Sequence, residues 1–210
     1  MTKQLMPMVQ PSKDLISKDG TINIKYLAGY PRQYRFDANK GFFNVKGHTP
    51  LTKKGETLTI VPIAFRVFSD DILGMGRKKW AEFFFLNDSQ QLCGLLLHGY
   101  SVQNLERDID EMFYDGVSFC NVALTITPVE KVSKQVVDGK NPKYFLCGFT
   151  YQVLDKKTQE TMDAVVEGLQ IWRDETLTGD AVMHLSCNFN PPIKSEELQE
   201  PEAQPEVATA

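Results

Sequence analysis

Apolar and polar residues alternate with period two along several stretches of the chain, and this pattern predicts strands with one buried face. One long stretch, 57–69, places Ile63, Phe65 and Val67 on one face. Pro62 stands inside it, and because proline cannot donate to a strand ladder, we expect an edge position or a bulge there. Further strands are predicted at 22–26, 41–47, 80–86, 92–98, 117–133, 144–154 and 181–187, with 87–90 as the turn of a hairpin.

Two other stretches repeat apolar residues at helical spacing. The first begins at Ser101, whose hydroxyl suits an N-cap, and ends before Gly116. The second covers 158–174. The order is therefore strand, strand, hairpin, helix, strand, strand, which is the order of the OB-fold, although an unrelated α+β sheet could share it. We predict a mainly β fold: an OB-fold-like five-stranded Greek-key barrel with a helix between strands 3 and 4, plus an extra C-terminal helix.

The chain has 210 residues, of which 42% are hydrophobic and 24% charged, and this suits one folded domain with terminal extensions. We predict an N-terminal extension at 1–40, an OB-like domain with its appended helix at 41–190, and an acidic tail at 191–210. The tail is rich in Pro, Glu, Gln and Ala, so it is expected to be disordered. The sequence has no apolar run of 18 residues and no apolar signal-peptide core, which favours a cytoplasmic protein without membrane contact.

The charge is divided unevenly along the chain. Residues 25–157 carry 18 Lys and Arg against 14 Asp and Glu, a net charge of +4. Residues 158–210 carry 2 against 11, a net charge of −9. A basic body with an acidic end is compatible with a solubilising tail, a segment that docks a partner, or a mimic of nucleic acid that competes for a basic groove.

Residue types that support catalysis or metal binding do not form a recognisable pattern. The four cysteines have no CxxC spacing, so we interpret them as buried free thiols rather than zinc ligands. The sequence lacks GxSxG, HExxH, GxxxxGK[ST] and GxGxxG. Asp108, Asp110 and Glu111 fall on the solvent face of the first predicted helix. We therefore predict no catalytic residues, no metal site and no cofactor.

Cations alternate with aromatic rings along the predicted strands and loops. A protein that binds single strands needs cations along the phosphates and flat rings on which bases stack. The candidate nucleic-acid-binding residues are Phe42, Phe43, Lys46, Lys53, Lys54, Arg66, Phe68, Arg77, Lys78, Lys79, Trp80, Phe84, Lys140, Lys143 and Tyr144. Taken singly, each ring can also be a core residue and each cation a solvated one. The alternative function is a protein-interaction or virion-structural module whose barrel face meets a protein.

In this arrangement the chain resembles OB-fold single-stranded DNA-binding proteins, and the phage-encoded type more than the bacterial housekeeping type. The resemblance rests on the strands at 41–47 and 60–68, the cluster at 77–80, the helix at 101–114 and the Glu-rich tail at 195–210. It implies cooperative coating of single-stranded DNA during replication or recombination, in the host cytoplasm for a phage protein. It also implies that the tail recruits replication or recombination proteins and shields the groove. The extra helix is a candidate for self-association into a homo-oligomer.

Overall fold

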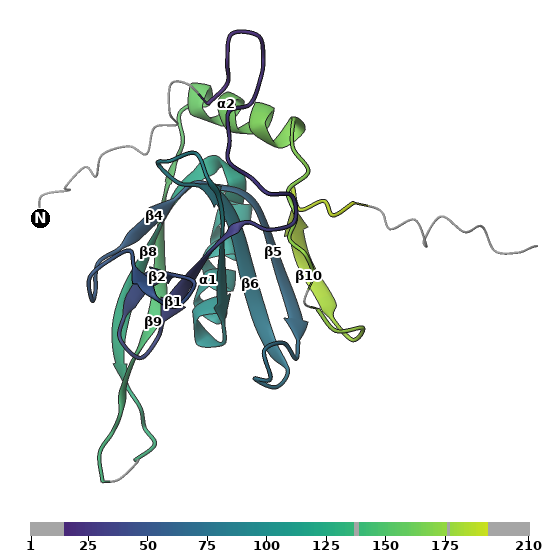
Figure 1. Cartoon of the computed structure of the whole chain (residues 1–210). Coiled ribbons are helices and arrows are strands. Elements are labelled where there is room, and N and C mark those ends of the chain that lie inside the picture. The colour runs from purple at the N-terminus through teal and green to yellow at the C-terminus, as the bar shows by residue number, and fades with distance from the viewer. Residues whose placement is uncertain (1–14, 137–138, 176, 193–210) are drawn as a thin grey trace, which may run out of the picture.

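The computed structural model describes residues 15–136, 139–175 and 177–192. The strands are β1 (Arg32–Asp37), β2 (Phe42–Val45), β3 (Thr49–Pro50), β4 (Leu58–Ile60), β5 (Pro62–Asp70), β6 (Lys78–Leu86), β7 (Leu92–His98), β8 (Val122–Val132), β9 (Lys143–Val153) and β10 (Val182–Cys187). The helices are α1 (Tyr100–Tyr114), α2 (Lys156–Glu167) and the short 3-10 helix η1 (Phe119–Asn121). A mixed sheet has the order β10-β5-β6-β7-β1-β2-β3, and a second sheet has the order β4-β8-β9 (Figure 1). The structure is therefore mainly β, as predicted.

One stretch of chain supplies strands to both sheets. β4 pairs with β8, with Leu58 opposite Ile126, and β5 pairs with β6 in the larger sheet. The register against β6 shifts between Pro62 and Ala64, so the bulge predicted at Pro62 is confirmed. The single strand predicted at 57–69 is two strands in the structure. Proline has no N–H for the ladder, and it lies where the chain passes from one sheet to the other.

The hairpin predicted between residues 80 and 98 is confirmed as β6 and β7, with Phe83 opposite Leu95. β7 has a second neighbour that the sequence did not reveal, because β1 runs parallel to it and pairs antiparallel with β2. The domain boundary predicted at residue 40 would separate these two paired strands. In β1 only Tyr34 and Phe36 are apolar, and polar residues surround them. The alternation was too short to predict a strand.

A helix lies where it was predicted, and α1 packs on β9. Its N-cap is Gly99, whose φ of +64° suits glycine, so the N-cap predicted at Ser101 was wrong. Ser101 is buried inside the helix, and its hydroxyl accepts a hydrogen bond from the Cys147 N–H at 3.0 Å. Asn104 Nδ2 donates to the Cys147 carbonyl at 3.0 Å. The Ser101 side chain therefore does not cap α1 but fixes the helix to β9.

α2 ends earlier than the helix predicted at 158–174. A Cβ on Gly168, the residue after the helix, would lie 2.2 Å from Cδ1 of Ile22, so a larger residue there would displace the end of the Ile22 side chain. Ile171 is buried in the extended chain that follows, and its N–H donates to Asn190 Oδ1 at 2.7 Å. The helical spacing of apolar residues beyond Gly168 therefore reflects an extended chain pressed against the sheet.

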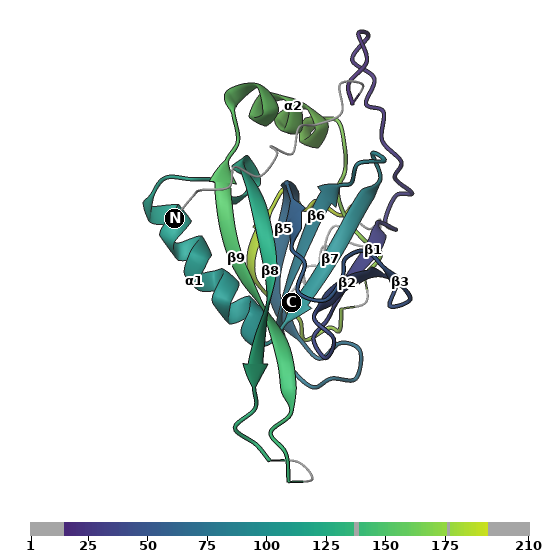
Figure 2. The same cartoon turned by 90° about the vertical axis from the view of Figure 1, so that its left-hand side faces the viewer.

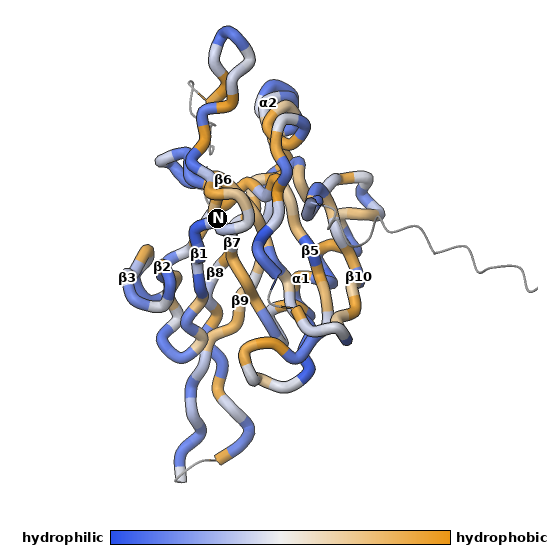
Figure 3. The backbone as a smooth tube through the Cα atoms, turned by 45° about the vertical axis from the view of Figure 1, so that its right-hand side comes forward, coloured by the Kyte–Doolittle hydropathy of each residue, from blue (hydrophilic) through white to orange (hydrophobic). Residues whose placement is uncertain are grey.

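Besides a small cluster of Phe68, Ile72 and Trp80, two larger apolar clusters fill the described structure. The larger lies between the two sheets and α1, and it includes Phe65, Phe83, Leu105 and Ile126. The smaller lies under α2 and combines helix residues with the segments that flank the sheet at both ends of the chain. Along the tube in Figure 3, hydrophobic positions mark the strands of the large sheet, and the end of the β8–β9 hairpin is mostly hydrophilic. The hairpin extends beyond the sheets (Figure 2).

The described strands do not close into the barrel that we expected. β1, β2 and β3 continue the large sheet beyond β7, while β9 remains at the edge of the small sheet. The two sheets meet on this side where the Phe145 N–H donates to the Ala38 carbonyl at 2.7 Å. The strand predicted at 181–187 is confirmed as β10, whereas 22–26 forms only isolated bridges. The predicted tail, from residue 193 on, lies outside the described residues.

Candidate nucleic-acid interface

Five of the fifteen predicted binding residues are buried, which corrects their assignment as contacts to a nucleic acid. Each has at most 2% of its surface exposed, and they are Phe43, Arg66, Phe68, Trp80 and Phe84. The alternation predicted one buried face for the long strand, but β5 is buried on both faces. The second sheet and α1 cover one face, and the chain after α2 covers the other.

Arg66 belongs to a buried ion network rather than to a binding face. Its Nε and Nη2 donate to Glu82 Oε2 at 3.0 and 2.8 Å, and its Nη1 donates to Glu175 Oε1 at 2.7 Å. Arg173 Nη1 donates to the other oxygen of Glu82 at 2.5 Å. The guanidinium group of Arg66 also lies 4.2 Å from the ring centroid of Phe189. Two cations and two anions balance one another here, so Arg66 has a structural role.

The same covering segment seals the outer face of β5 and β6. Phe189 stacks on Phe84 with ring centroids 5.6 Å apart. At the other end, the Asp70 carboxylate accepts hydrogen bonds from the hydroxyl and the N–H of Thr178. Burial by itself raises the pKa of Asp70, but these hydrogen bonds outweigh it and hold the pKa below its ordinary value. This face of β5 and β6 is thus covered by this chain's own residues.

The basic triplet before β6 is largely engaged within the molecule. Lys79 Nζ donates to Glu106 Oε1 at 2.7 Å, and Arg77 Nη2 donates to the Asp180 carbonyl at 3.1 Å. Lys78 pairs in register with Asp70, whose carboxylate is also close enough to Arg77 for an attractive charge interaction. Arg77 and Lys79 have side-chain partners within the molecule, so these two cations are weaker candidates for phosphate contacts than the sequence indicated.

A second group of predicted cations is brought together where the β8–β9 hairpin meets the loop before β4. Lys54 and Lys143 both contact Glu130, at 3.8 and 2.6 Å. The hydrogen bond from Lys143 lowers the pKa of Glu130, so this carboxylate stays ionised. Lys54 Nζ also lies 5.2 Å from the ring centroid of Phe145. The other predicted residues in this region that are exposed or half-exposed are Phe42, Lys53, Lys140 and Tyr144.

An open groove of about 760 Å³ lies where the chain enters β1 and where β2 ends. Its lining brings together the cations Lys25, Arg32, Lys46 and Arg173, with Asp174 as the carboxylate of the lining. Because Arg173 is bound to the buried carboxylate of Glu82, the groove's exposed cations are the other three. Within the described residues, no ion pair is formed by Lys25, Arg32 or Lys46. We call this feature the β1 groove.

An aromatic ring also lines the β1 groove. Tyr30 is 60% exposed, and its hydroxyl donates to Asp174 Oδ2 at 3.1 Å, a hydrogen bond that raises the pKa of Tyr30. Of the groove residues, the sequence analysis identified only Lys46. The other charged residues of the lining lie in the predicted extension (Lys25 and Arg32) or in the predicted second helix (Arg173 and Asp174). The stretch KYLAGYPRQYR, residues 25–35, alternates cations with rings and would have been found by the same criterion.

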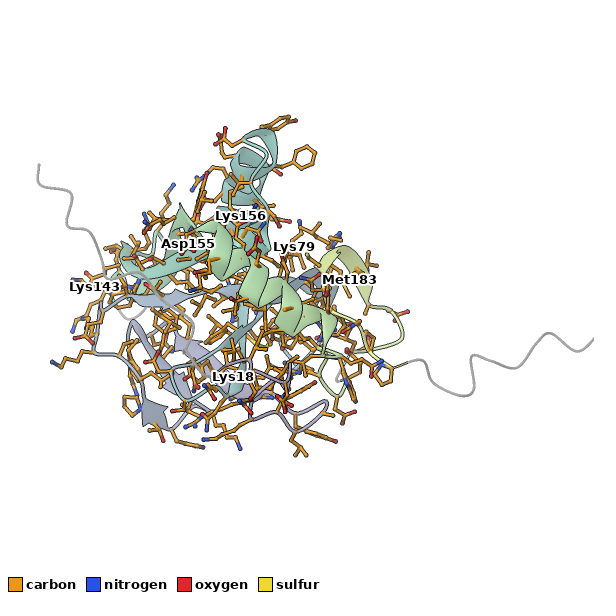
Figure 4. The ribbon with its side chains drawn as sticks, turned by 90° about the horizontal axis from the view of Figure 1, so that it is seen from above. Lys18, Lys79, Lys143, Asp155, Lys156 and Met183 are labelled. Carbon is orange, nitrogen blue, oxygen red and sulfur yellow. The ribbon has the colours of Figure 1, made fainter. Side chains whose placement is uncertain are left out.

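Charge is segregated between two sides of the molecule. Residues 25–58, which form β1 to β4 and their approach, carry 7 Lys and Arg against 2 Asp and Glu. Residues 100–116, at α1, carry 1 against 5. Figure 2 shows α1 and the β1–β3 strands on opposite sides. In the view from above, Lys143 of β9 and Met183 of β10 also lie far apart (Figure 4). The basic side therefore comprises the β1 groove and the Lys54–Lys143 cluster.

Comparison with protein-family models, with curated proteins and with solved structures finds no match to this chain. The described residues contain no group of three or more His, Cys, Asp and Glu side chains placed to hold a metal ion. In the same part of the chain, none of the helices has both the length and the apolar character needed to cross a bilayer.

Proposed function

We propose that this chain binds single-stranded DNA with little sequence preference, along its basic side. The observation that carries the proposal is the β1 groove, in which three exposed cations from separate segments line an open channel beside an exposed tyrosine ring. Cations follow the phosphates of a single strand, and a ring offers a stacking platform for a base of any type. The Lys54–Lys143 cluster extends the same positive surface toward the hairpin.

The order of elements supports an OB-like origin for this surface. A bent first strand (β4 and β5), a hairpin (β6 and β7), a helix, and two further strands (β8 and β9) follow one another as in that fold. β4 pairs with β8, which joins the first and fourth of these strands. We infer an OB-like core in which β1 to β3 extend the sheet beyond its third strand. The binding surface is then displaced onto those added strands, because the usual strand face is sealed.

The test is fluorescence anisotropy with a labelled thirty-base oligo-dT, titrated at several salt concentrations against the matching duplex. We expect the single strand to bind more tightly than the duplex, with an affinity that falls as salt rises. The triple variant Lys25→Gln/Arg32→Gln/Lys46→Gln should weaken binding by roughly tenfold or more and flatten the salt slope by about 2 for three lost phosphate contacts. The matched control, Arg77→Gln/Lys79→Gln, should change both quantities little.

A second pair of variants separates stacking from charge. Tyr30→Ala should weaken binding by about 1–3 kcal/mol at every salt concentration, whereas Tyr30→Phe keeps the ring and should bind like the wild type. If the control double variant weakens binding and the groove triple does not, the groove assignment is wrong. If the full chain fails to bind oligo-dT at low salt, the function itself is wrong, and a protein-interaction module becomes the better hypothesis.

Roles in replication or recombination follow from the same proposal. A protein that coats single strands without sequence preference acts wherever such strands are exposed. The acidic residues of the tail would then recruit partner proteins or compete for the basic side. A chain lacking residues 195–210 should bind oligo-dT more tightly at low salt and keep nearly the same melting temperature.

A further inference from the structure

Two thiols from distant parts of the chain face each other beside the outer edge of the large sheet. Cys120 lies in η1, and Cys187 is the last residue of β10, 67 positions further on. Their sulfur atoms are 3.7 Å apart. The surrounding backbone is held on both sides, because Cys187 pairs in register with Phe65, whose ring lies 4.5 Å from that of Phe119. Cys120 is buried and Cys187 is half-buried, so one sulfur of the pair can be reached from solvent.

The other two cysteines differ in every relevant respect. Cys93 and Cys147 are completely buried, and neither has another cysteine sulfur beside it among the contacts of the described residues. Burial raises the pKa of Cys93 to about 11 and that of Cys147 to about 12, so both remain protonated thiols. Cys93 and Cys147 therefore serve as internal controls for any reaction of Cys120 and Cys187.

We propose that Cys120 and Cys187 form a reversible dithiol–disulfide pair, which a low-molecular-weight disulfide such as oxidised glutathione closes. A disulfide needs the two sulfur atoms about 2.05 Å apart, so closure requires a movement of less than 2 Å. Side-chain rotation can supply much of it at Cys187, which is not tightly enclosed. The two sequence neighbourhoods share no CxxC motif, which is why the cysteine spacing did not predict the pair.

The hydrogen-bond geometry suits Cys187 to attack first. The Cys120 thiol donates to the Cys187 sulfur, and this hydrogen bond lowers the pKa of Cys187 to about 7. The same bond, together with burial, raises the pKa of Cys120. A substantial fraction of Cys187 is therefore thiolate at neutral pH, and the thiolate is the nucleophile in disulfide exchange.

The exchange takes two steps. The Cys187 thiolate attacks one sulfur of oxidised glutathione, an S–S bond breaks, and one glutathione thiolate leaves. Cys120 then loses its proton to solvent, its sulfur attacks Cys187 Sγ, and the second glutathione thiolate leaves. The protein loses two electrons and two protons, and one oxidised glutathione becomes two reduced ones. Excess reduced glutathione reverses both steps.

Closure would tie down the segment that seals the outer face of the sheet. Directly after Cys187, Asn188 Nδ2 donates to the Ile63 carbonyl at 2.9 Å, and Phe189 stacks on Phe84. A covalent bond at Cys187 anchors the start of this segment to η1 on the other side of β5. Because it closes a long loop of chain, the disulfide should raise the melting temperature by several degrees.

The test uses the full chain and its four cysteines. Reduced protein is incubated with oxidised glutathione, alkylated after denaturation, and analysed by intact mass and peptide mapping, with thermal unfolding measured in parallel. We expect a loss of two hydrogens, a linked peptide pair containing Cys120 and Cys187, and full alkylation at Cys93 and Cys147. The oxidised protein should melt several degrees higher, and excess reduced glutathione should restore the original value.

Two variants make the outcome decisive. Cys187→Ser should abolish both the linkage and the shift in melting temperature, while Cys120→Ser should accumulate a stable glutathione adduct at Cys187. Cys93→Ser is the matched control and should behave like the wild type. A wild-type protein that stays fully alkylatable, forms only a glutathione adduct, links chains to one another, or links another pair of cysteines would overturn the proposal.

Discussion

Replacing Glu82 with glutamine tests the conclusion that the face of β5 and β6 is sealed by an internal ion network. Glu82 is 1% exposed and Arg66 is 2% exposed. The carboxylate accepts three hydrogen bonds, two from Arg66 and one from Arg173. A glutamine fills almost the same volume, so Glu82→Gln removes the charge with little change of packing. It leaves the guanidinium group of Arg66 paired only with Glu175, which is 31% exposed.

The expected loss of stability follows from the charge of Arg66 that Glu82→Gln leaves only partly compensated. Removing one partner of a buried ion pair costs about 3–5 kcal/mol, because the other charge stays desolvated without compensation. The glutamine carbonyl can still accept one hydrogen bond, and Glu175 still offsets part of the charge, so we expect about 3 kcal/mol. For a chain of this size that corresponds to a melting temperature lower by roughly 6–12 °C. The assay is urea unfolding followed by circular dichroism, with the slope against urea compared between variants.

Control variants separate the effect of the lost Glu82 charge from the effect of replacing a glutamate by glutamine. Glu175→Gln removes the half-buried partner and should cost less than Glu82→Gln, and Glu56→Gln on the surface should cost less than about 0.5 kcal/mol. The double variant Arg66→Met/Glu82→Gln should be less destabilised than the sum of its single variants, since the buried guanidinium of Arg66 is removed together with the carboxylate that it needs. A Glu82→Gln protein within 1 kcal/mol of wild type, at unchanged slope, would refute the buried network.

Two further predictions concern side-chain hydrogen bonds that fix a neighbouring segment to each of the two sheets. The pKa of Asp70 is lowered from 3.8 through its bonds to Thr178, so its contribution to stability is present above that value and lost as the pH falls through the lower folded value. Asp70→Asn should therefore be less stable than wild type at pH 7 and lose stability less steeply below pH 4, measured by urea unfolding across pH. Ser101→Ala should cost about 1–3 kcal/mol, because the buried N–H of Cys147 loses its acceptor. Ser118→Ala, where the side chain makes no capping bond, should unfold like wild type in the same assay.

Much of the fold could be predicted because local patterns agree with the final structure. The strands β6 to β9 alternate clearly, and α1 has a strong apolar face that ends at glycine. β1 was missed because the polar residues around Tyr34 and Phe36 hide its alternation, and its parallel partner lies sixty positions away. α2 was extended too far because Leu169 and Trp172 continue the helical spacing. In the structure Leu169 and the buried Ile171 pack from an extended chain. Such burial depends on Ile22, which no local pattern connects to them.

The candidate site was harder to predict, because a charge on a strand looks the same whether it faces solvent or a buried partner. Arg66 lies on the second face of its strand, as a binding residue would, yet its partners are supplied by Glu82 and by Glu175 from beyond α2. Lys46 was found, since it follows a clear strand. Lys25 and Arg32 were missed because they precede the predicted domain, and the β1 groove exists only after the parallel pairing of β1 with β7.

The sealed face of β5 and β6 and the open β1 groove follow from segments that the chain adds to either side of the large sheet. The chain after α2 lies across β5 and β6 and contacts Arg66, Asp70 and Phe84, so these three side chains are not available to a ligand. β1 joins β7 on the far side, and the adjoining chain places Lys25, Arg32 and Lys46, which form no ion pair among the described residues, along the β1 groove. A ligand with phosphates and flat bases therefore meets its complementary groups on β1 and β2. If strands added to the edge determine where this molecule binds, the groove variants should alter binding without altering stability, and Glu82→Gln should alter stability while changing the salt slope little.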